Sequence, residues 1–162
     1  MTFTVTLDDS AVRAGLDRMP QVMVQSLANQ AERLALKLEA HVQRDKLQGQ
    51  VLNPRSGKLS RSIHHDGSDS GTAVTRRVYS AGVPYAGVHE FGFDGVEEVR
   101  AHLRSVVFGR QVEPFTVGPF SRHMKLPERS FLRSSLKDMR EEIVTGLGEA
   151  GRAGARQAIG QR

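Results

Sequence analysis

The chain contains no cysteine, so disulfide bonds, thiolate nucleophiles and cysteine-ligated zinc or iron–sulfur sites are all excluded. It has no tryptophan and only 2 tyrosines, which leaves few aromatic side chains for stacking nucleic-acid bases. Its apolar runs are far shorter than the ~20 residues that cross a bilayer, and residues 1–4 lack the pattern of a signal peptide. We therefore expect a protein that is made in the cytoplasm, contacts no membrane and depends on packing and assembly for stability.

The 162 residues suit one domain, since a single hydrophobic core commonly serves roughly 100 to 200 residues. We expect that domain to cover residues 1–147, followed by a flexible basic tail rich in glycine and alanine at 148–162, because the last residues offer little apolar surface. The formal net charge of +5 permits contact with phosphates or with an acidic protein surface, and it does not choose between them.

Two elements are predicted in the N-terminal third of the chain. Residues 2–7 alternate Phe3, Val5 and Leu7 with threonine, which predicts a strand with one buried face. Asp8-Asp9-Ser10 then offers helix-capping residues, and apolar residues recur every three or four positions from Leu16 to Val42. This pattern predicts a long amphipathic helix. Proline lacks a backbone donor, so we favour a short helix that ends near Pro20 and a longer one that starts there.

The middle of the chain predicts a small antiparallel sheet. Gly, Asn, Pro and Ser cluster at 48–58 and indicate a loop, residues 59–63 then start a strand, and residues 64–71 form a turn or flexible tip. Residues 72–80 return as a second strand with Val74, Arg76 and Val78 on one side. The spacing of apolar residues at 85–91 predicts a short helix that lies on the sheet.

Residues 93–126 predict a long β-hairpin, with the hairpin itself at 94–125. The segments 99–104 and 117–123 are similar, and Gly109 lies between them, where it can form a turn. Arms of about 12 residues at ~3.3 Å each would extend ~40 Å, and an isolated two-stranded ribbon of that length is marginal in water. We therefore expect a projecting ribbon that packs on a neighbouring subunit, through the apolar side chains of Val99, Leu103, Val107, Phe108, Phe115 and Phe120.

A C-terminal helix completes the predicted fold. Ser130 is a plausible N-cap, and an apolar stripe follows from Phe131 and Leu132 to Leu147. The expected fold class is α+β: a small antiparallel sheet is packed by a long N-terminal helix and a C-terminal helix, with a projecting hairpin.

No group of residues predicts catalysis or a bound cofactor. The pair His64-His65 lies near Asp66 and Asp69, but adjacent strand residues point to opposite faces, which favours a solvated loop over a metal site. The pair His89-Glu90 lacks the second histidine of a zinc-protease helix, and no Gly-x-Ser-x-Gly or phosphate-binding loop is present. We expect no metal, no cofactor and no enzymatic activity.

Basic residues on the ribbon leave nucleic-acid binding open. Four arginines are the possible DNA-facing residues: Arg100, Arg104, Arg110 and Arg122. The alternative is that they keep the ribbon hydrated and pair with nearby carboxylates. Since no helix-turn-helix pattern is present, sequence-specific recognition is not expected.

Three motifs in a fixed order resemble one protein family. Residues 56–63, SGKLSRSI, are similar to a motif (Thr/Ser)-Gly-x-Leu-x-x-Ser-Ile at the entry to a sheet. Residues 84–92, PYAGVHEFG, resemble a motif built on Tyr-Ala and Glu-Phe-Gly, and residues 126–136, LPERSFLRSSL, resemble a Leu-Pro-x-Arg-(Pro/Ser)-Phe-Leu motif before a last helix. The family is that of bacteriophage neck, tail-completion and virion-morphogenesis proteins, and the resemblance covers roughly residues 20–147.

The resemblance implies a structural virion protein that forms a homo-oligomeric ring, commonly sixfold, at the head–tail junction. Its partners would be the connector or stopper and the tail-tube or terminator proteins, with non-specific contact to genomic DNA left open. A tail terminator or other minor tail protein is the alternative, and a non-virion DNA-binding protein is a third reading. The motif residues expected to be structural are Gly57, Leu59, Ile63, Tyr85, Glu90, Phe91, Gly92, Pro127, Arg129, Phe131 and Leu132.

Individual roles can be predicted for some of these motif residues. Tyr85 and Phe91 are expected to be buried against the sheet, and Gly92 to end the short helix. Arg129 either pairs with a carboxylate such as Glu90 or is a surface charge. The family often has proline at the position of Ser130, and the ribbon is longer here than in short members.

Overall fold

The computed structural model describes residues 10–70 and 73–160, so the strand predicted at 2–7 and the capping residues Asp8 and Asp9 lie outside the described part. The chain divides into two compact units. The first contains the residues up to Val83 together with those from Phe131 onward, and the second is Pro84–Ser130. The single domain expected over 1–147 is therefore interrupted by an inserted second unit.

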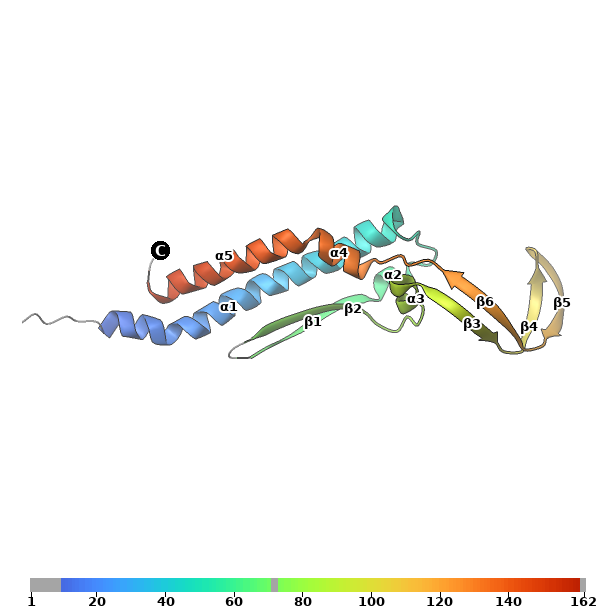
Figure 1. Ribbon diagram of the computed structural model, residues 1–162, viewed down its shortest axis with the longest axis horizontal. Helices are drawn as coiled ribbons and strands as arrows, with labels where there is room; N and C mark the ends of the chain where they lie inside the picture. Colours follow the sequence, from blue (N-terminus) through green and yellow to red (C-terminus); the bar gives the residue numbers. More distant parts are fainter. Residues whose placement is uncertain (1–9, 71–72, 161–162) are drawn as a thin grey trace, which may run out of the picture. The chain divides into compact units, whose positions relative to one another are not determined.

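Helix α1 (Ser10–His41) is the longest element of the first unit, and it continues into a wider helical segment, η1 (Val42–Gln50). The break predicted at Pro20 is wrong, because α1 continues through it (Figure 1). A proline removes one hydrogen bond from a helix, and here its ring lies on the exposed side, where a helix accommodates it most easily. Gly49, with a φ of 115°, lies where η1 ends.

Two helices at the C-terminal end complete the helical layer. They are α4 (Leu132–Asp138) and α5 (Arg140–Ala158), separated at Met139, so the single helix predicted here is divided. Helix α5 lies alongside α1 (Figure 1). A flexible tail from residue 148 is therefore not what the structure shows, since the helix continues to Ala158.

Small residues explain why the glycine-rich C-terminal segment is an ordered helix. A Cβ at Gly154 would lie 2.9 Å from the Cα of Met23 on α1, which means that only glycine allows the two backbones to approach so closely. The Ser26 hydroxyl donates a hydrogen bond of 2.8 Å to the Ala150 carbonyl across the same contact. The composition that suggested too little apolar surface therefore serves close helix–helix packing.

The sheet of the first unit contains strands β1 (Ile63–Asp69) and β2 (Val74–Ser80), paired antiparallel. Two predictions fail here. Residues 58–61 form one turn of helix, α2 (Lys58–Arg61), after Gly57 with a φ of 66°, and residues 64–69 continue the strand instead of forming a tip. Polar residues persist in the strand because cross-strand ion pairs such as Arg77–Asp66 stabilise it. The predicted strand at 72–80 is confirmed for Val74–Ser80.

The core of the first unit forms where the helices meet the start of the sheet. The side chains of Val42, Ile63 and Phe131 have no exposed surface, and smaller residues such as Ala28 and Ala35 fill the α1 face. Helix α1 is the element that packs on both α5 and β2. Within the described residues, no helix combines the length and the apolar character needed to span a membrane.

The second unit is a short helix followed by four strands. They are α3 (Ala86–Phe91), β3 (Phe93–Val99), β4 (His102–Val107), β5 (Arg110–Val117) and β6 (Phe120–Leu126). Strand β3 pairs with β6, and β4 pairs with β5, so the four strands form two nested antiparallel pairs. The predicted short helix at 85–91 is confirmed, and so is the α+β class with a long N-terminal helix, small antiparallel sheets and C-terminal helices. Projection of the ribbon towards a neighbour stays a prediction.

Candidate assembly interface

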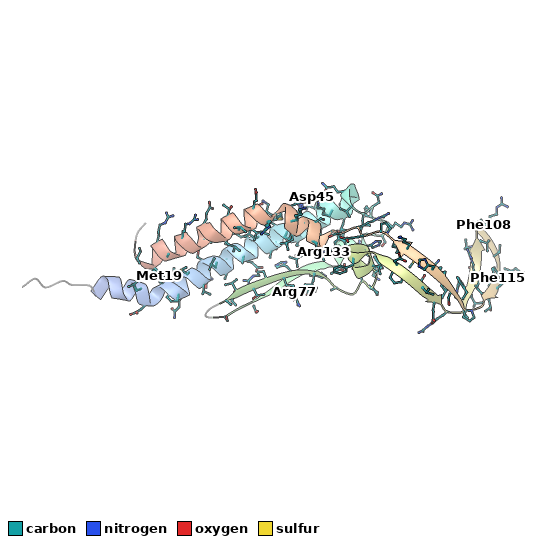
Figure 2. All side chains as sticks on the ribbon, viewed as in Figure 1. Met19, Asp45, Arg77, Phe108, Phe115 and Arg133 are labelled. Carbon is teal, nitrogen blue, oxygen red and sulfur yellow. The ribbon has the colours of Figure 1, made fainter. Side chains whose placement is uncertain are left out.

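The inner hairpin, β4 and β5, ends in a two-residue turn. Phe108 and Gly109 both have positive φ, 51° and 78°, between the paired residues Val107 and Arg110. Two consecutive positive φ values match the type I′ turn, whose twist suits an antiparallel hairpin. The turn predicted from Gly109 is confirmed, and it holds the Phe108 ring, 99% exposed, at the tip (Figure 2).

The two faces of the inner hairpin differ in character. Because Leu103 pairs with Thr116 and Val107 pairs with Arg110, these residues share a face with the alternate β5 residues Val112 and Pro114. We call Leu103, Val107, Val112 and Pro114 the apolar tip face. The other face carries His102, Arg104, Val106, Gln111, Glu113, Phe115 and Val117. Between the pairs Arg104–Phe115 and Val106–Gln111, three β5 residues lie opposite the single β4 residue Ser105, so the register shifts by two residues and the faces are the same on both sides of the shift.

The outer pair, β3 and β6, is amphipathic by the same alternation. One face carries Phe93, Val99, Phe120, Met124 and Leu126 around an ion pair, Arg122–Glu97, of 2.6 Å. The opposite face carries a charged cluster in which His123 and Lys125 contact Asp94 at 3.0 and 3.5 Å. Strands β3 and β6 pair only with each other, and no other element of the second unit packs extensively on them.

The six residues predicted to form the interface do not share one surface. Leu103 and Val107 lie on the apolar tip face, Phe115 lies on its reverse, and Phe108 is in the turn. Val99 and Phe120 are direct partners in the outer pair. The sequence analysis missed four exposed apolar residues of the ribbon, which period-2 counting within each strand would have found: Val96, Val106, Val112 and Leu126.

The four possible DNA-facing arginines are also dispersed. The Arg122 charge is paired with Glu97, and Arg104 donates from Nε to the Val106 carbonyl. Arg104 and Arg110 lie on opposite faces of the inner hairpin, and Arg100 is in the segment between β3 and β4. The ribbon therefore presents no single face on which these four guanidinium groups converge.

Hydrogen bonds connect the motif at residues 84–92, which includes α3, to residues 129–130 at the end of the second unit. The Glu90 side chain is buried and accepts a 2.8 Å hydrogen bond from the Ser130 hydroxyl, so Ser130 contacts α3, and the residue at the N-cap of α4 is Phe131. The Arg129 backbone N–H donates to the His89 carbonyl at 2.8 Å. The predicted N-cap role of Ser130 is thus wrong, and the proposed Arg129–Glu90 pair stays a prediction.

The structure agrees with the prediction for Gly92 and differs from the predictions for Tyr85 and Phe91. Gly92, with a φ of 75°, follows α3 as predicted, and a Cβ there would meet the Glu128 nitrogen at 2.9 Å. Tyr85 and Phe91 were expected to be buried, but they are 41% and 67% exposed. Tyr85, the N-cap residue of α3, instead contacts the His89 ring edge-on.

The remaining motif residues lie in the first unit, except for Pro127 and Arg129 in the second. Ile63 and Phe131 are fully buried, and Leu132 is half-buried. Gly57 adopts the left-handed conformation before α2, and the Leu59 carbonyl accepts a hydrogen bond from the Ser62 hydroxyl. Pro127 is exposed in the segment after β6.

A charge network that the sequence analysis did not predict connects α1 to the sheet. The His65 ring lies between two α1 carboxylates, with Nδ1 2.5 Å from Glu39 and Nε2 3.0 Å from Glu32. These contacts, with Glu39 first, raise the pKa of His65 because both ring nitrogens can donate only when the imidazole is protonated. Arg76 donates to Glu32 and Asp69, and hydrogen bonds from His65 and then Arg76 lower the pKa of Glu32. The spacing of Glu32 and Glu39, two helical turns apart, is the sequence signal for this contact.

Within residues 10–70 and 73–160, no group of three or more His, Asp or Glu side chains has the geometry to hold a metal ion. Comparison of the chain with protein-family models, curated protein sequences and solved structures finds no match.

Proposed function

We propose that this protein is a structural component of a tailed bacteriophage virion that forms a homo-oligomeric ring at the head–tail junction. It joins the connector to the tail, with the tail-tube or terminator proteins as its further partners, and catalyses no reaction. It would be assembled in the host cytoplasm and remain in the neck of the virion. The proposed assembly and the proposed position in the virion are supported by different observations.

Exposed apolar side chains on a two-stranded ribbon carry the assembly part of the proposal. Leu103 is 73% exposed, and Phe108 is 99% exposed in a turn conformation that costs a non-glycine residue about 1 kcal/mol or more. Val96, Val106, Val112, Phe115 and Phe120 add further exposed apolar surface on the same ribbon. A ribbon without a covering layer is marginal alone, so contact with a second copy gives these side chains the burial they lack.

The three ordered motifs support the phage part of the proposal. Four of their residues occupy turn and core positions: Gly57 and Gly92 have positive φ, while Ile63 and Phe131 are fully buried. A subunit whose described side chains form ion networks and core contacts suits an architectural role. The proposed position at the neck follows from the resemblance of these motifs to the phage neck family.

The dispersed arginines weigh against a dedicated DNA-binding protein. Such a protein would neutralise several phosphates from one surface, and its affinity would fall steeply with salt. Here Arg122 forms an ion pair with Glu97, and Arg104 and Arg110 lie on opposite faces of the inner hairpin. Non-specific contact with DNA in a ring lumen needs no such convergence.

Imaging of virions that carry a label on this protein tests the proposal directly. Negative-stain images should show the label at the junction of head and tail, in a band one ring thick. A label at the distal end of the tail, or a label found only on protein that is not part of virions, would overturn the proposed position. Purified tail tubes provide the comparison with a terminator, since a terminator caps tubes in the absence of filled heads.

A further inference from the structure

An apolar groove of about 570 Å³ runs along the first unit. Its floor comes from α1, one wall from β2, and the other wall from α4 and α5. The lining is aliphatic apart from two arginines: Leu27, Ala31, Leu34, Ala35, Leu38, Val74, Arg76, Val78, Leu132, Arg133, Leu136, Ile143 and Leu147. The volume is in the range of sites that hold a ligand or a chain segment.

The groove lies between the two surfaces that α1 already uses. Ser26 and Gln30 face α5, and Glu32 and Glu39 face β1 through His65. The groove residues Leu27, Leu34 and Leu38 recur at helical spacing on a third stripe between those two. The core of the first unit is therefore open along one side, where a further layer would cover α1.

Strand β2 offers a backbone edge at that open side. In the part of the chain that the structure describes, β2 pairs with β1 and with no other strand. The strand residues that line the groove belong to β2, which puts the groove on the side of β2 away from β1. A strand added along that edge would complete the ladder and place alternate side chains in the groove.

We propose that residues 2–7 of a second copy of this chain occupy the groove as a third strand beside β2. This segment alternates Phe3, Val5 and Leu7 with three threonines, so it offers one apolar face for the groove and one polar face for water. Its six residues approach the length of β2, which has 7. β-branched and aromatic residues dominate the segment, as they do in strands.

Chain length decides between a strand of the same copy and one of a second copy. At 1.5 Å per residue, Leu27, where the groove floor begins, lies about 26 Å along the axis from Ser10 at the start of α1. The chain from Leu7 to Ser10 spans at most ~11 Å when extended. A copy therefore cannot lay Phe3, Val5 and Leu7 together over its own groove, whereas the segment of a neighbour has no such limit.

This inference rests on the proposed ring, because a strand passed from each copy to the next is a head-to-tail contact. Such a contact uses two different surfaces of each subunit and closes into a ring when the rotation between copies permits. The exposed ribbon remains a separate contact surface in the same assembly.

Single-cysteine variants test the occupant, since the natural chain has no cysteine that would interfere. We would co-express Val5→Cys and Leu136→Cys proteins and cross-link them with a short bis-maleimide. We expect a covalent dimer at least tenfold more abundant than from Leu136→Cys alone. A second experiment places Val5→Cys and Leu136→Cys in the same chain. If this double variant gives only an internally cross-linked monomer and no dimer, the groove is occupied by the chain's own strand and the inference is wrong. Dimers from Leu103→Cys with Leu136→Cys instead would assign it to the ribbon of a neighbour and also overturn the inference.

Charge substitutions test which face of the strand is buried and separate this inference from the ring itself. Val5→Asp should raise the concentration for half-assembly at least tenfold, while Thr4→Asp on the opposite face should leave it within about twofold. If Val5→Asp assembles like the natural chain, the strand contact is wrong and the ring stands. If the natural chain stays monomeric at every concentration, the ring and the inference both fail.

Discussion

In the first unit, Val42, Ile63 and Phe131 are fully buried, whereas on the ribbon of the second unit Leu103 and Phe108 are largely exposed. Both regions contain apolar side chains at regular spacing. They differ in the number of layers, since helix α1 packs on β1 and β2 while the ribbon strands pair only with one another. Spacing therefore identifies the apolar face of an element, and only the neighbouring layer determines whether that face is buried within the chain or by another molecule.

Phenylalanine-to-alanine substitution in each region should give the largest contrast. Phe131→Ala removes a fully buried ring and should lower the free energy of unfolding by about 3–5 kcal/mol. Phe108→Ala removes an exposed ring and should change it by less than about 0.5 kcal/mol. Urea unfolding followed by the helical circular-dichroism signal measures both. Equal losses would mean that the Phe108 ring is also part of a core.

Glycine substitutions in α5 should give a smaller contrast within the first unit. Gly154→Ala should lower the free energy of unfolding by about 1–3 kcal/mol, because its Cβ would meet the α1 backbone at Met23. Gly148→Ala should raise it by roughly 0.5–1 kcal/mol, since the nearest atom is the end of the Arg152 side chain, 3.9 Å away. Thermal unfolding compares the pair. A stabilised Gly154→Ala protein would contradict the close approach of α1 and α5.

The pH dependence of stability should show the smallest effect. The folded-state pKa of His65 is raised above 6.5, so its contribution is complete below pH 6.5 and is lost as pH rises through the folded value. Glu32 has the opposite sign: its pKa is lowered, and its contribution is lost as pH falls through the folded value. His65→Gln should therefore flatten the decline of stability above pH 6.5, and the matched change His64→Gln, on the other face of β1, should retain it. An unchanged profile in His65→Gln would contradict the role of the contacts with Glu32 and Glu39.

Local patterns predicted those elements whose burial depends on near neighbours. The α1 stripe, the strand at Val74–Ser80, the helix at Ala86–Phe91 and the turn at Gly109 follow from spacing and turn chemistry alone. The helix beyond residue 147 was missed because its glycines are favourable only against α1, a partner that the sequence does not reveal. The strand at His64–Asp69 was missed for the same reason, since Arg76 and Arg77 on β2 stabilise its polar residues.

The paired strands of the ribbon were predicted, while the distribution of the apolar residues over its faces was not. A long antiparallel ribbon with exposed apolar residues follows from the pattern at 93–126. The face of each residue depends on the register in which the strands pair, and the strand pattern alone does not specify that register. Phe115 pairs with Arg104, the neighbour of Leu103 on β4, and therefore lies on the opposite face from Leu103, although the sequence analysis placed both in one interface.

The mass of the protein in solution tests the central claim that the apolar tip face is covered by another copy. Sedimentation of the natural chain should give an assembly of several 17.8 kDa subunits, and Leu103→Asp combined with Val112→Asp should reduce it to single subunits. The matched control, His102→Asp with Gln111→Asp on the other face, should keep the mass of the assembly. A natural chain that sediments as one subunit at every concentration, or an undiminished assembly in the Leu103 and Val112 variant, would contradict the account.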